Sequence, residues 1–389
     1  MSEPVGTGKK LVFWLILLGF VWGVFELVAY FGFSGDDDIF DHRAQVLARL
    51  NAADLARFAQ KTGDPVLGWD HRGPRSSREV NCIGQEVGYS FDAAGARVYP
   101  GYEAENAGII VIGDSYSNGA EVNDAETYPA RLGSLLGVSV VNHGVGGYGP
   151  LQSLLLLEQK AARYPALKVA ILGIMYENIY RMVNSYRAVL YEENSIDYGL
   201  KPYMAGGEIR PYPGADALVD IDRFKTYANR AFDEDFWAKP SDDFPYSLSL
   251  LRGLSSHYFY FRRFQKRFRK LGIPEYFLAF RSEAFLSELF PLLAHYTRFA
   301  QQHGLTPIAI FIPRNVYDTR SATRLIAEHR DRFPDGLVVG DVGMADIDWD
   351  RFNLISPESG DHCHPSAYGY EQIAEYVAVL LRDRGAWEH

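Results

Sequence analysis

The sequence predicts a doubly wound α/β domain, in which helices cover both faces of a mainly parallel sheet. Short apolar runs bounded by Gly, Pro or Asp recur from residue 108 onward, as is typical of strands buried on both faces. Amphipathic stretches such as "LQSLLLLEQKAARYP" lie between these runs, so strand and helix signals alternate along the chain. The five runs expected to form strands are 108–114, 138–144, 168–175, 306–313 and 336–343.

The N-terminal 38 residues stand apart from this domain. An almost continuous apolar run covers residues 11–33, which is longer than the roughly 20 residues that a helix needs to cross a bilayer core. A cleaved signal peptide would have a shorter apolar region and a small-residue cleavage site. A buried core helix is a poorer fit to the length and to the position at the N-terminus. The run therefore predicts an uncleaved transmembrane signal anchor.

The charges around this run predict its orientation. Lys9 and Lys10 precede the span, and three aspartates follow it at 36–38. Because positive residues stay on the cytoplasmic side, residues 1–38 are expected to be a cytoplasmic tail and anchor, with the rest of the chain extracytoplasmic, in a periplasm. Glu26 is unusual within a span. A partner helix or a function would account for it, but a protonated or snorkelling side chain is the simpler expectation.

Residues 39–107 are expected to connect the anchor to the α/β domain. Apolar positions at helical spacing over 39–60 predict a helical stalk. Residues 61–107 are rich in Gly, Pro, Asp and Arg, and this composition predicts a loop-rich lead-in with a short hairpin.

The α/β domain is expected over 108–389, with an insertion at 184–280 between the third and fourth strands. An insertion at this place would lie over the strand ends, as a lid or a substrate wall. Within it, the pattern at 257–272 predicts an amphipathic helix with a basic face. We expect this helix to pack on the domain rather than on a membrane surface.

Charge and cysteine content restrict the class of protein. The 389 residues carry a formal net charge of −10, which does not favour a nucleic-acid partner. The two cysteines, Cys82 and Cys363, would often pair in an oxidising compartment. Two separate, partly buried thiols are the alternative, and the sequence alone does not show that the two residues are close.

A candidate nucleophile follows the first predicted strand. Ser115 lies in "GDSYSNG", where its hydroxyl would stand at the carboxyl edge of the sheet, near the free N–H groups that begin the next helix. A helix N-cap is the alternative role for a serine at this place. The stretch does not match the G-x-S-x-G elbow, because Ser117 occupies the position of the second glycine.

A serine nucleophile needs a base, and the stretch "SGDHCHPSAYGY" offers one. If it forms a turn, the spacing of Asp361 and His364 would let the carboxylate accept the Nδ1–H of the imidazole while Nε2 faces outward. A polar loop with a helix cap is one alternative. A metal site of Asp361, His362 and His364 is less favoured, because no other cluster of His or Cys supplies further ligands.

Oxyanion donors are expected at the same sheet edge. "NHGVGGYG" follows the second strand and would expose backbone N–H groups at Gly146 and Gly147. "GIMYENIYR" follows the third strand and places the amide of Asn178 there. Turn glycines and a capping asparagine are the alternative roles.

These four blocks, in this order, resemble those of the SGNH (GDSL-like) hydrolases. The resemblance covers residues 108–183 and 300–382 and leaves the anchor, stalk and insertion unexplained. It implies a flavodoxin-like three-layer α/β/α fold and ester chemistry without a metal or cofactor. The roles that it implies are nucleophile for Ser115, base for His364 and orientation of that histidine for Asp361. Ser115 N–H, Gly147 N–H and the Asn178 amide would be the oxyanion donors. Ile179 departs from the pattern, which usually has an acidic residue after the asparagine.

The combined expectation is a serine esterase that removes a small acyl group, acetyl in preference, from an extracytoplasmic carbohydrate or a similar ester. An acyltransferase acting on an envelope glycan would use the same acyl-enzyme and a sugar hydroxyl in place of water. A lipid esterase or thioesterase is the next alternative, followed by a non-catalytic glycan-binding scaffold. The expected partners are the acylated substrate and the membrane, without nucleic acid.

Overall fold

The computed structural model describes residues 7–33, 38–191, 197–238, 244–254, 256–258, 261 and 276–387. Its centre is a five-stranded, fully parallel sheet in the order β11-β10-β7-β5-β6. Counted by their appearance in the chain, these strands lie in the order 2-1-3-4-5, which is the flavodoxin-like arrangement. They fall within one or two residues of the predicted runs: β5 (Ala107–Gly113), β6 (Ser139–Gly144), β7 (Val169–Met175), β10 (Thr306–Ile312) and β11 (Val338–Asp341).

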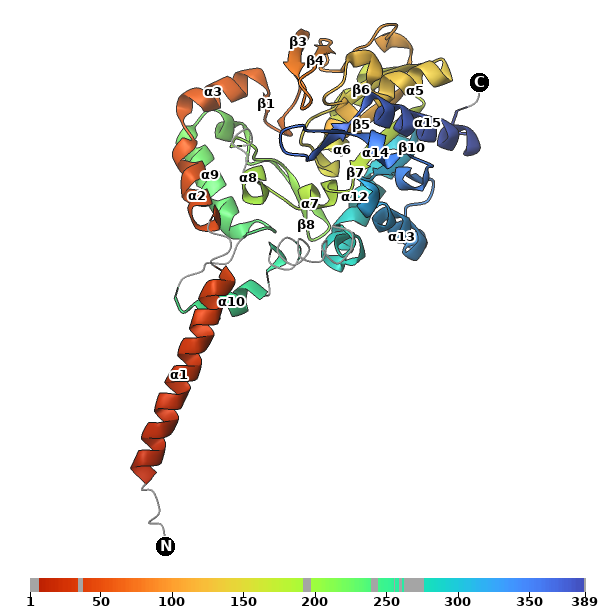
Figure 1. Ribbon diagram of the computed structural model, residues 1–389. Coiled ribbons are helices and arrows are strands. Elements are labelled where there is room, and N and C mark those ends of the chain that lie inside the picture. Colours follow the sequence, from red (N-terminus) through yellow and green to blue (C-terminus); the bar gives the residue numbers. More distant parts are fainter. Residues whose placement is uncertain are drawn as a thin grey trace.

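Helices cover both faces of the sheet, so the predicted three-layer arrangement is present (Figure 1). Alternate residues of β5 point to opposite faces, and all seven are buried. Ile109 and Val111 join one core with helices α5 (Tyr128–Leu136) and α15 (Ala367–Asp383). Ile110 and Ile112 join the other core with α6 (Pro150–Lys160), α12 (Glu283–Gln302) and α13 (Arg320–Glu328).

Helix α1 (Thr7–Phe33) extends away from the rest of the molecule as a single rod (Figure 1). Its segment Gly8–Tyr30 has a mean hydropathy of 2.4, and only 6% of its most apolar window is buried against protein. The segment is therefore a candidate membrane span by length and composition, a description that a signal sequence would also fit.

The segment expected as a stalk forms helices α2 (Asp38–Arg49) and α3 (Ala52–Lys61), but it packs on the domain instead of standing free. Helix α2 lies beside α9 (Ile221–Glu234) of the insertion (Figure 1). Arg43 pairs with Asp233 at 2.8 Å, and Arg49 pairs with Asp197 at 2.7 Å. Apolar residues of both helices are buried in the same core as α6 and α12, so amphipathic periodicity here reflects packing against the insertion.

The lead-in contains the expected hairpin. Strands β3 (Arg75–Val80) and β4 (Glu86–Phe91) pair antiparallel, and two short strands, β1 (Gly63–Asp64) and β2 (Gly68–Trp69), precede them. β3 is exposed along its length, whereas every second residue of β4 is buried toward the domain.

The insertion between β7 and β10 packs on the domain through aromatic side chains that share one core with α6 and α12. Helix α7 (Asn178–Met182) precedes it. Its own elements include α8 (Arg187–Leu190), β8 (Tyr203–Ala205), β9 (Glu208–Arg210), α9 and α10 (Tyr246–Leu254). The rings of Trp237 and Tyr180 are 4.7 Å apart, both are buried, and both contact Phe285 of α12. These aromatic side chains therefore hold the insertion together. Most of the basic helix expected at 257–272 lies outside the described residues.

The short helix α4 (Ser115–Asn118) packs on glycines at or near the carboxyl ends of three strands. The buried Ser117 side chain occupies the space that Gly113 and Gly173 leave without side chains, and its hydroxyl lies 2.9 Å from the Tyr128 hydroxyl. A Cβ on Gly144 would overlap the backbone nitrogen of Asn118. Ser117, which departs from the hydrolase elbow pattern, is therefore the residue that seats α4 on the sheet.

Gly144→Ala should destabilise the protein by roughly 1–3 kcal/mol, because its methyl group cannot fit against the backbone of α4. Gly146→Ala is the matched control, since a Cβ there meets open space and its φ is not positive. It should change stability by less than about 1 kcal/mol. Thermal unfolding of the purified full chain in detergent measures both effects, and equal losses in the two variants would contradict this seating of α4.

Candidate active site

The structure gives the capping role in "GDSYSNG" to Asp114 and leaves the hydroxyl of Ser115 for another contact. Asp114 is the N-cap of α4 and accepts the backbone N–H of Tyr116 at 3.0 Å. Ser115, the first residue of the helix, is half-buried, and its Oγ lies 2.9 Å from Nε2 of His364. The cap and the candidate nucleophile are thus neighbouring residues with separate contacts.

His364 has a partner on each ring nitrogen. Nε2 faces Ser115 Oγ, and Nδ1 lies 2.8 Å from Oε1 of Glu121. His364 belongs to β13 (His362–Pro365), which pairs antiparallel with β12 (Asn353–Ile355). Ser115, His364 and Glu121 therefore form a continuous hydrogen-bonded series, with the imidazole in the middle.

The carboxylate beside His364 is not the one expected from the sequence. Asp361 is exposed, and no hydrogen bond joins it to His364 in the described part of the chain. The Asp-x-x-His spacing brings two side chains together only on a turn or a helix, and residues 362–365 are extended. Along an extended segment, residues three apart point to opposite faces. The expected contact between Asp361 and His364 is therefore not made in this structure.

Glu121 reaches His364 through an unusual backbone conformation. Its φ of 68° is positive, and it is the one residue other than glycine with this feature in the described chain. The turn begins at Gly119, the left-handed C-cap of α4, and the Glu121 N–H donates to the Tyr89 hydroxyl at 2.7 Å. A glutamate six residues after Ser115 at the same sheet edge was the available signal in the sequence, but no local spacing pattern identifies such a residue.

A buried arginine fixes the loop that carries Glu121. The Arg97 guanidinium donates to the carbonyl oxygens of Asn118 at 2.8 Å and Val122 at 2.7 Å, which flank the turn. It also pairs with Asp124 at 2.8 Å. The Arg97 side chain is 1% exposed. Because each contact fixes a backbone or carboxylate position on either side of Glu121, the loop has little freedom to move away from His364.

The electrostatic setting favours a charged Glu121. Burial opposes ionisation of this carboxyl, but its hydrogen bond to His364, the charge of His364 and the Cys82 N–H outweigh burial. The pKa of Glu121 therefore lies below its usual value. The Cys82 N–H donates to Oε2 at 3.3 Å, while Oε1 faces the histidine. The carboxylate is thus held at both oxygens.

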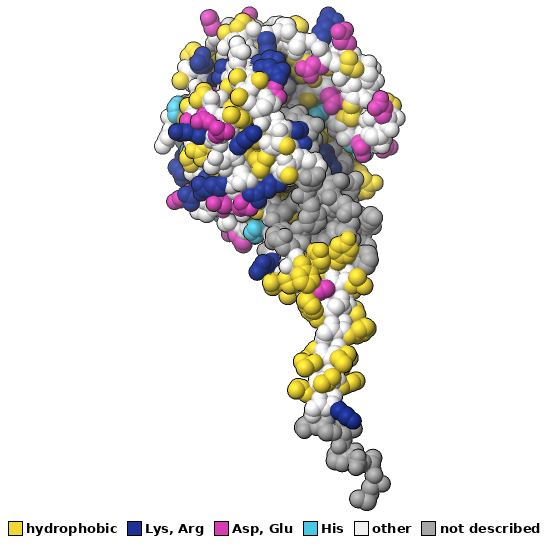
Figure 2. Space-filling view, turned by 90° about the vertical axis from the view of Figure 1, so that its left-hand side faces the viewer, with side chains coloured by type: hydrophobic (Ala, Val, Ile, Leu, Met, Phe, Trp, Pro, Cys, Tyr) yellow, Lys and Arg dark blue, Asp and Glu magenta, His cyan; other side chains and the backbone are white. Residues whose placement is uncertain are grey.

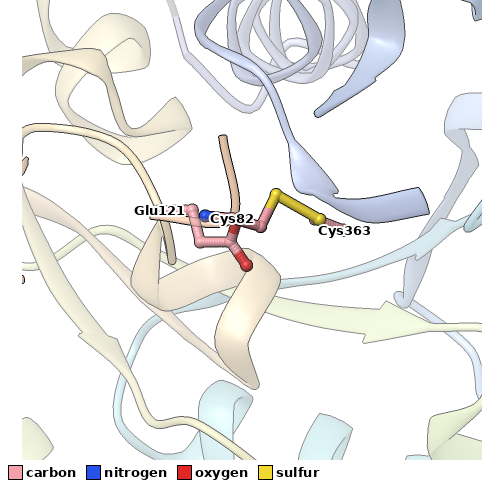
Figure 3. Close-up of side chains that lie close together, drawn as sticks. All are labelled: Cys82, Glu121 and Cys363. Carbon is pink, nitrogen blue, oxygen red and sulfur yellow. A yellow bond between two sulfur atoms is a disulfide. The ribbon is translucent and has the colours of Figure 1, made fainter. Parts of the chain in front are cut away.

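Cys82 and Cys363 form a disulfide beside these groups (Figure 3). The bond joins residues 281 positions apart and ties the loop after β3 to the strand that carries His364. Of the two possibilities left open by the sequence, the structure has the paired form. Cys363 is next to His364, and the Cys82 N–H donates to the Glu121 carboxylate. The disulfide therefore joins the segment of the imidazole to a segment that holds its carboxylate partner.

The candidate oxyanion loop is held from two sides. Gly147 has a φ of 82°, and its carbonyl oxygen accepts from Arg187 of α8 at 2.5 Å. The carbonyl of Gly146 accepts from the Trp69 indole N–H at 3.1 Å. The loop after β6 is therefore clamped between the lead-in and the insertion, which gives the insertion a direct contact with the site.

Asn178 begins α7 at the end of β7 and is buried. Its Oδ1 has no hydrogen-bond partner among the described residues. One turn later on the same helix, Arg181 reaches Asp114 at 3.4 Å, so α7 is joined to the cap of α4. The structure therefore places Asn178 on a helix that contacts the segment of Ser115.

The acidic residue next to Asn178 stands before it, as Glu177, and Ile179 is a core residue. Burial opposes ionisation of Glu177, but Arg181, the Tyr191 hydroxyl and Arg314 outweigh burial and lower the pKa of Glu177 to about 2. The Arg181 guanidinium lies 3.0 Å from the carboxylate and that of Arg314 lies 3.7 Å away. This ion cluster anchors the start of α7.

Comparisons with known proteins add little to this geometry. No family model and no curated protein matches the chain. Among solved structures, a protein from Desulfitobacterium hafniense DCB-2, described as lipolytic and of the G-D-S-L family, aligns with a TM-score of 0.31 and 14% identity. The alignment covers 71% of this chain and 100% of that protein. The chemistry of the site therefore has to be argued from its own residues.

Glu177→Gln should destabilise the protein at pH 7 by roughly 1–3 kcal/mol, because it removes the charge held by Arg181 and Arg314. The pKa of Glu177 is depressed in the folded state, so the wild type has this contribution above about pH 5 and loses it as the pH falls toward 2. The stability difference between wild type and Glu177→Gln should shrink accordingly in thermal unfolding measured from pH 7 to pH 3.

The exposed Glu371→Gln on α15 is the control for a general change of charge, and it should track the wild type at every pH. A difference for Glu177→Gln that stays constant with pH would show that Glu177 is not held as a charged group.

Proposed function

We propose that the chain is a serine esterase that removes a small acyl group, acetyl in preference, from a carbohydrate or a similar ester outside the cytoplasm. The observation that carries this proposal is the series Ser115 Oγ, His364 and Glu121, with separations of 2.9 Å and 2.8 Å. A hydroxyl, an imidazole and a carboxylate in this order form the arrangement that activates a serine for attack on a carbonyl. A non-catalytic scaffold would have no need of it.

The roles follow from the contacts. With the imidazole neutral, Nδ1–H donates to Glu121 and Nε2 accepts the proton of Ser115 as its oxygen attacks the ester carbonyl. The charge of Glu121 stabilises the imidazolium that forms. His364 then gives its proton to the leaving alcohol, and an acyl group remains on Ser115. Water, activated by the same imidazole, releases the acid and restores the serine.

Three donors are proposed to stabilise the oxyanion of the tetrahedral intermediate. They are the N–H groups of Ser115 and Gly147 and the amide of Asn178. The clamping of the Gly147 loop by Arg187 and Trp69 supports this role, because oxyanion donors act best when they are fixed before the reaction. In this proposal, the insertion serves catalysis by holding the loop in place.

A hollow beside Glu121, lined by both polar and apolar residues, supports a carbohydrate as the substrate. It has a volume of about 570 Å³ and includes Glu121 in its wall. Amide and carboxylate side chains that could bond sugar hydroxyls line it, together with Tyr368, over whose ring the Arg351 guanidinium lies at 4.2 Å. The polar residues in its wall are Asn81, Gln85, Glu86, Asn123, Glu126, Asn353 and Ser366. The same acyl-enzyme would also permit transfer to a sugar hydroxyl in place of water.

A fluorophosphonate probe should label Ser115, because it reacts with a serine that a neighbouring base activates. The wild type should incorporate one probe per chain, located by peptide mapping, and Ser115→Ala should incorporate none. Ser117→Ala is the matched serine control and should keep labelling if it folds. A folded wild type that stays unlabelled would remove both the esterase and the transferase. If labelling is found, products formed with and without an oligosaccharide acceptor distinguish hydrolysis from transfer.

Glu121→Gln should lower kcat for a short-chain ester by about 10²–10⁴-fold, because a neutral amide cannot stabilise the imidazolium. Asp361→Asn, in contrast, should stay within about threefold of the wild type, since its side chain is exposed and does not contact His364. Steady-state kinetics of the two purified variants make the comparison. A large loss in Asp361→Asn with full activity in Glu121→Gln would reverse the assignment.

A further inference from the structure

In the described residues of helix α10, the serines are buried and leucines are exposed, which is the opposite of a helix that packs on a water-soluble domain. Its serines are buried, with Ser247 9% and Ser249 3% exposed. Two of its leucines point outward, with Leu248 43% and Leu251 57% exposed. Arg252 is also exposed, and Phe244 just before the helix is 64% exposed. In water the apolar side of a helix is the buried one. The exposed surface of α10 therefore suits a membrane interface, where the leucines and Phe244 enter the apolar layer and the Arg252 side chain extends toward polar headgroups.

Helix α10 lies against the end of α1 that is nearest to the domain (Figure 1). The rings of Trp22 and Phe244 are 5.8 Å apart, and those of Tyr30 and Tyr246 are 5.3 Å apart. Hydrophobic side chains line the rod formed by α1 and gather at the end of the rod that faces the domain (Figure 2). The outward face of α10 is thus continuous with the surface of the candidate span.

The contact between the two helices accounts for Glu26, which the sequence left as an anomaly within the span. Glu26 is 7% exposed. The Ser247 N–H lies 3.3 Å from each carboxyl oxygen of Glu26, and the Ser247 hydroxyl donates to the same group. N–H groups in the first turn of a helix have no acceptor within that helix. Glu26 supplies one, and α10 in return supplies donors to a carboxyl that would be unfavourable in hydrocarbon.

These contacts also fix the depth of α10. Trp22 and Glu26 both lie within the span Gly8–Tyr30, and they contact Phe244 and Ser247. Where α1 crosses a bilayer, the start of α10 must therefore lie at the level of the last two turns of the span. Lipid, and not water, would then surround its outward side chains.

We propose that α10 is a second membrane element, which lies in the leaflet on the side of the domain with Phe244, Leu248 and Leu251 against lipid acyl chains. This proposal rests on the part of the proposed function that places α1 across the membrane. Helix α10 joins α1 through Glu26 and joins the domain through the segments on either side of it. Before it, Phe236 packs against Phe285 of α12, and after it, His257 stacks on Phe236 at 4.0 Å. The insertion would thus keep the domain close to the membrane surface.

Depth-dependent fluorescence quenching of the full chain in vesicles of phosphatidylcholine and phosphatidylglycerol tests this placement. Single cysteines are introduced as Leu251→Cys in α10, Leu18→Cys in the span and Val219→Cys on the domain, where Val219 is 82% exposed. Each is labelled with the environment-sensitive dye NBD under non-reducing conditions, so that the native disulfide does not react. Phospholipids with a doxyl group on the acyl chain quench from the lipid, and iodide quenches from water.

The Leu251 label should lose most of its emission to doxyl lipid, as the Leu18 label does, while the Val219 label responds only to iodide. A Leu251 label that behaves like Val219, with Leu18 quenched by lipid, would overturn the placement of α10 and leave the membrane anchor and the esterase standing. If the Leu18 label itself responds to iodide alone, α1 is not inserted and the proposal for α10 fails with it. Neither result changes the labelling of Ser115 by the phosphonate.

Glu26→Ala tests the link between the two helices. In this background the Leu251 label should become more accessible to iodide, because the first turn of α10 loses its acceptor. Glu26→Gln retains a carbonyl oxygen and should keep the Leu251 label in lipid. An unchanged Leu251 label in Glu26→Ala would show that Glu26 does not hold α10. Formation of the native disulfide reports folding in all variants.

Discussion

The buried guanidinium of Arg97 is the interaction on which the candidate site depends. A charged group away from water is tolerated only when its donors are satisfied, and here carbonyl oxygens and one carboxylate surround it. These acceptors come from the hairpin, at Gly88, and from the loop that follows α4. The ring of Tyr89 lies below the same guanidinium at 4.3 Å, and its hydroxyl accepts the N–H of Glu121. A lysine could not replace this planar set of donors.

Because of this constraint, the loop-rich lead-in is part of the site and not only a connection to it. It supplies Arg97, the hairpin that Arg97 contacts, the indole of Trp69 at the oxyanion loop and one half of the disulfide. On the opposite side, the insertion acts through Arg187, and α7 just before it acts through Arg181. The sheet edge thus presents Ser115, while segments outside the α/β repeat determine what stands around it.

The fold was predictable because buried parallel strands leave a strong local signal. Seven consecutive buried residues in β5 or β7 require a run of apolar side chains, and such runs are visible without any knowledge of their neighbours. The partner of a helix leaves no such signal. The periodicity of residues 39–60 predicts the helices correctly, yet it does not say that the buried face of α2 meets α9, because any apolar surface would select the same pattern.

The site was predictable in part for the same reason. Ser115 closely follows strand β5, and His364 closely precedes helix α15. The order of strands and helices therefore predicts that both residues lie at the carboxyl edge of the sheet. The carboxylate could not be assigned in this way. The choice between Asp361 and Glu121 depends on whether residues 362–365 are extended or turned, and on a positive φ at a glutamate. Both are decided by distant contacts, those of β12 and of Arg97.

The disulfide between Cys82 and Cys363 relates the site to the place where the protein is made. In the cytoplasm thiols remain reduced, so a newly synthesised chain would have the segment of His364 and the loop of Cys82 joined only by non-covalent contacts. If the domain is exported as proposed, the covalent link forms after translocation. The residues around Glu121 would then reach their final arrangement only in the compartment that holds the substrate, and the chain would be least able to act on esters of the cytoplasm that it passes through first.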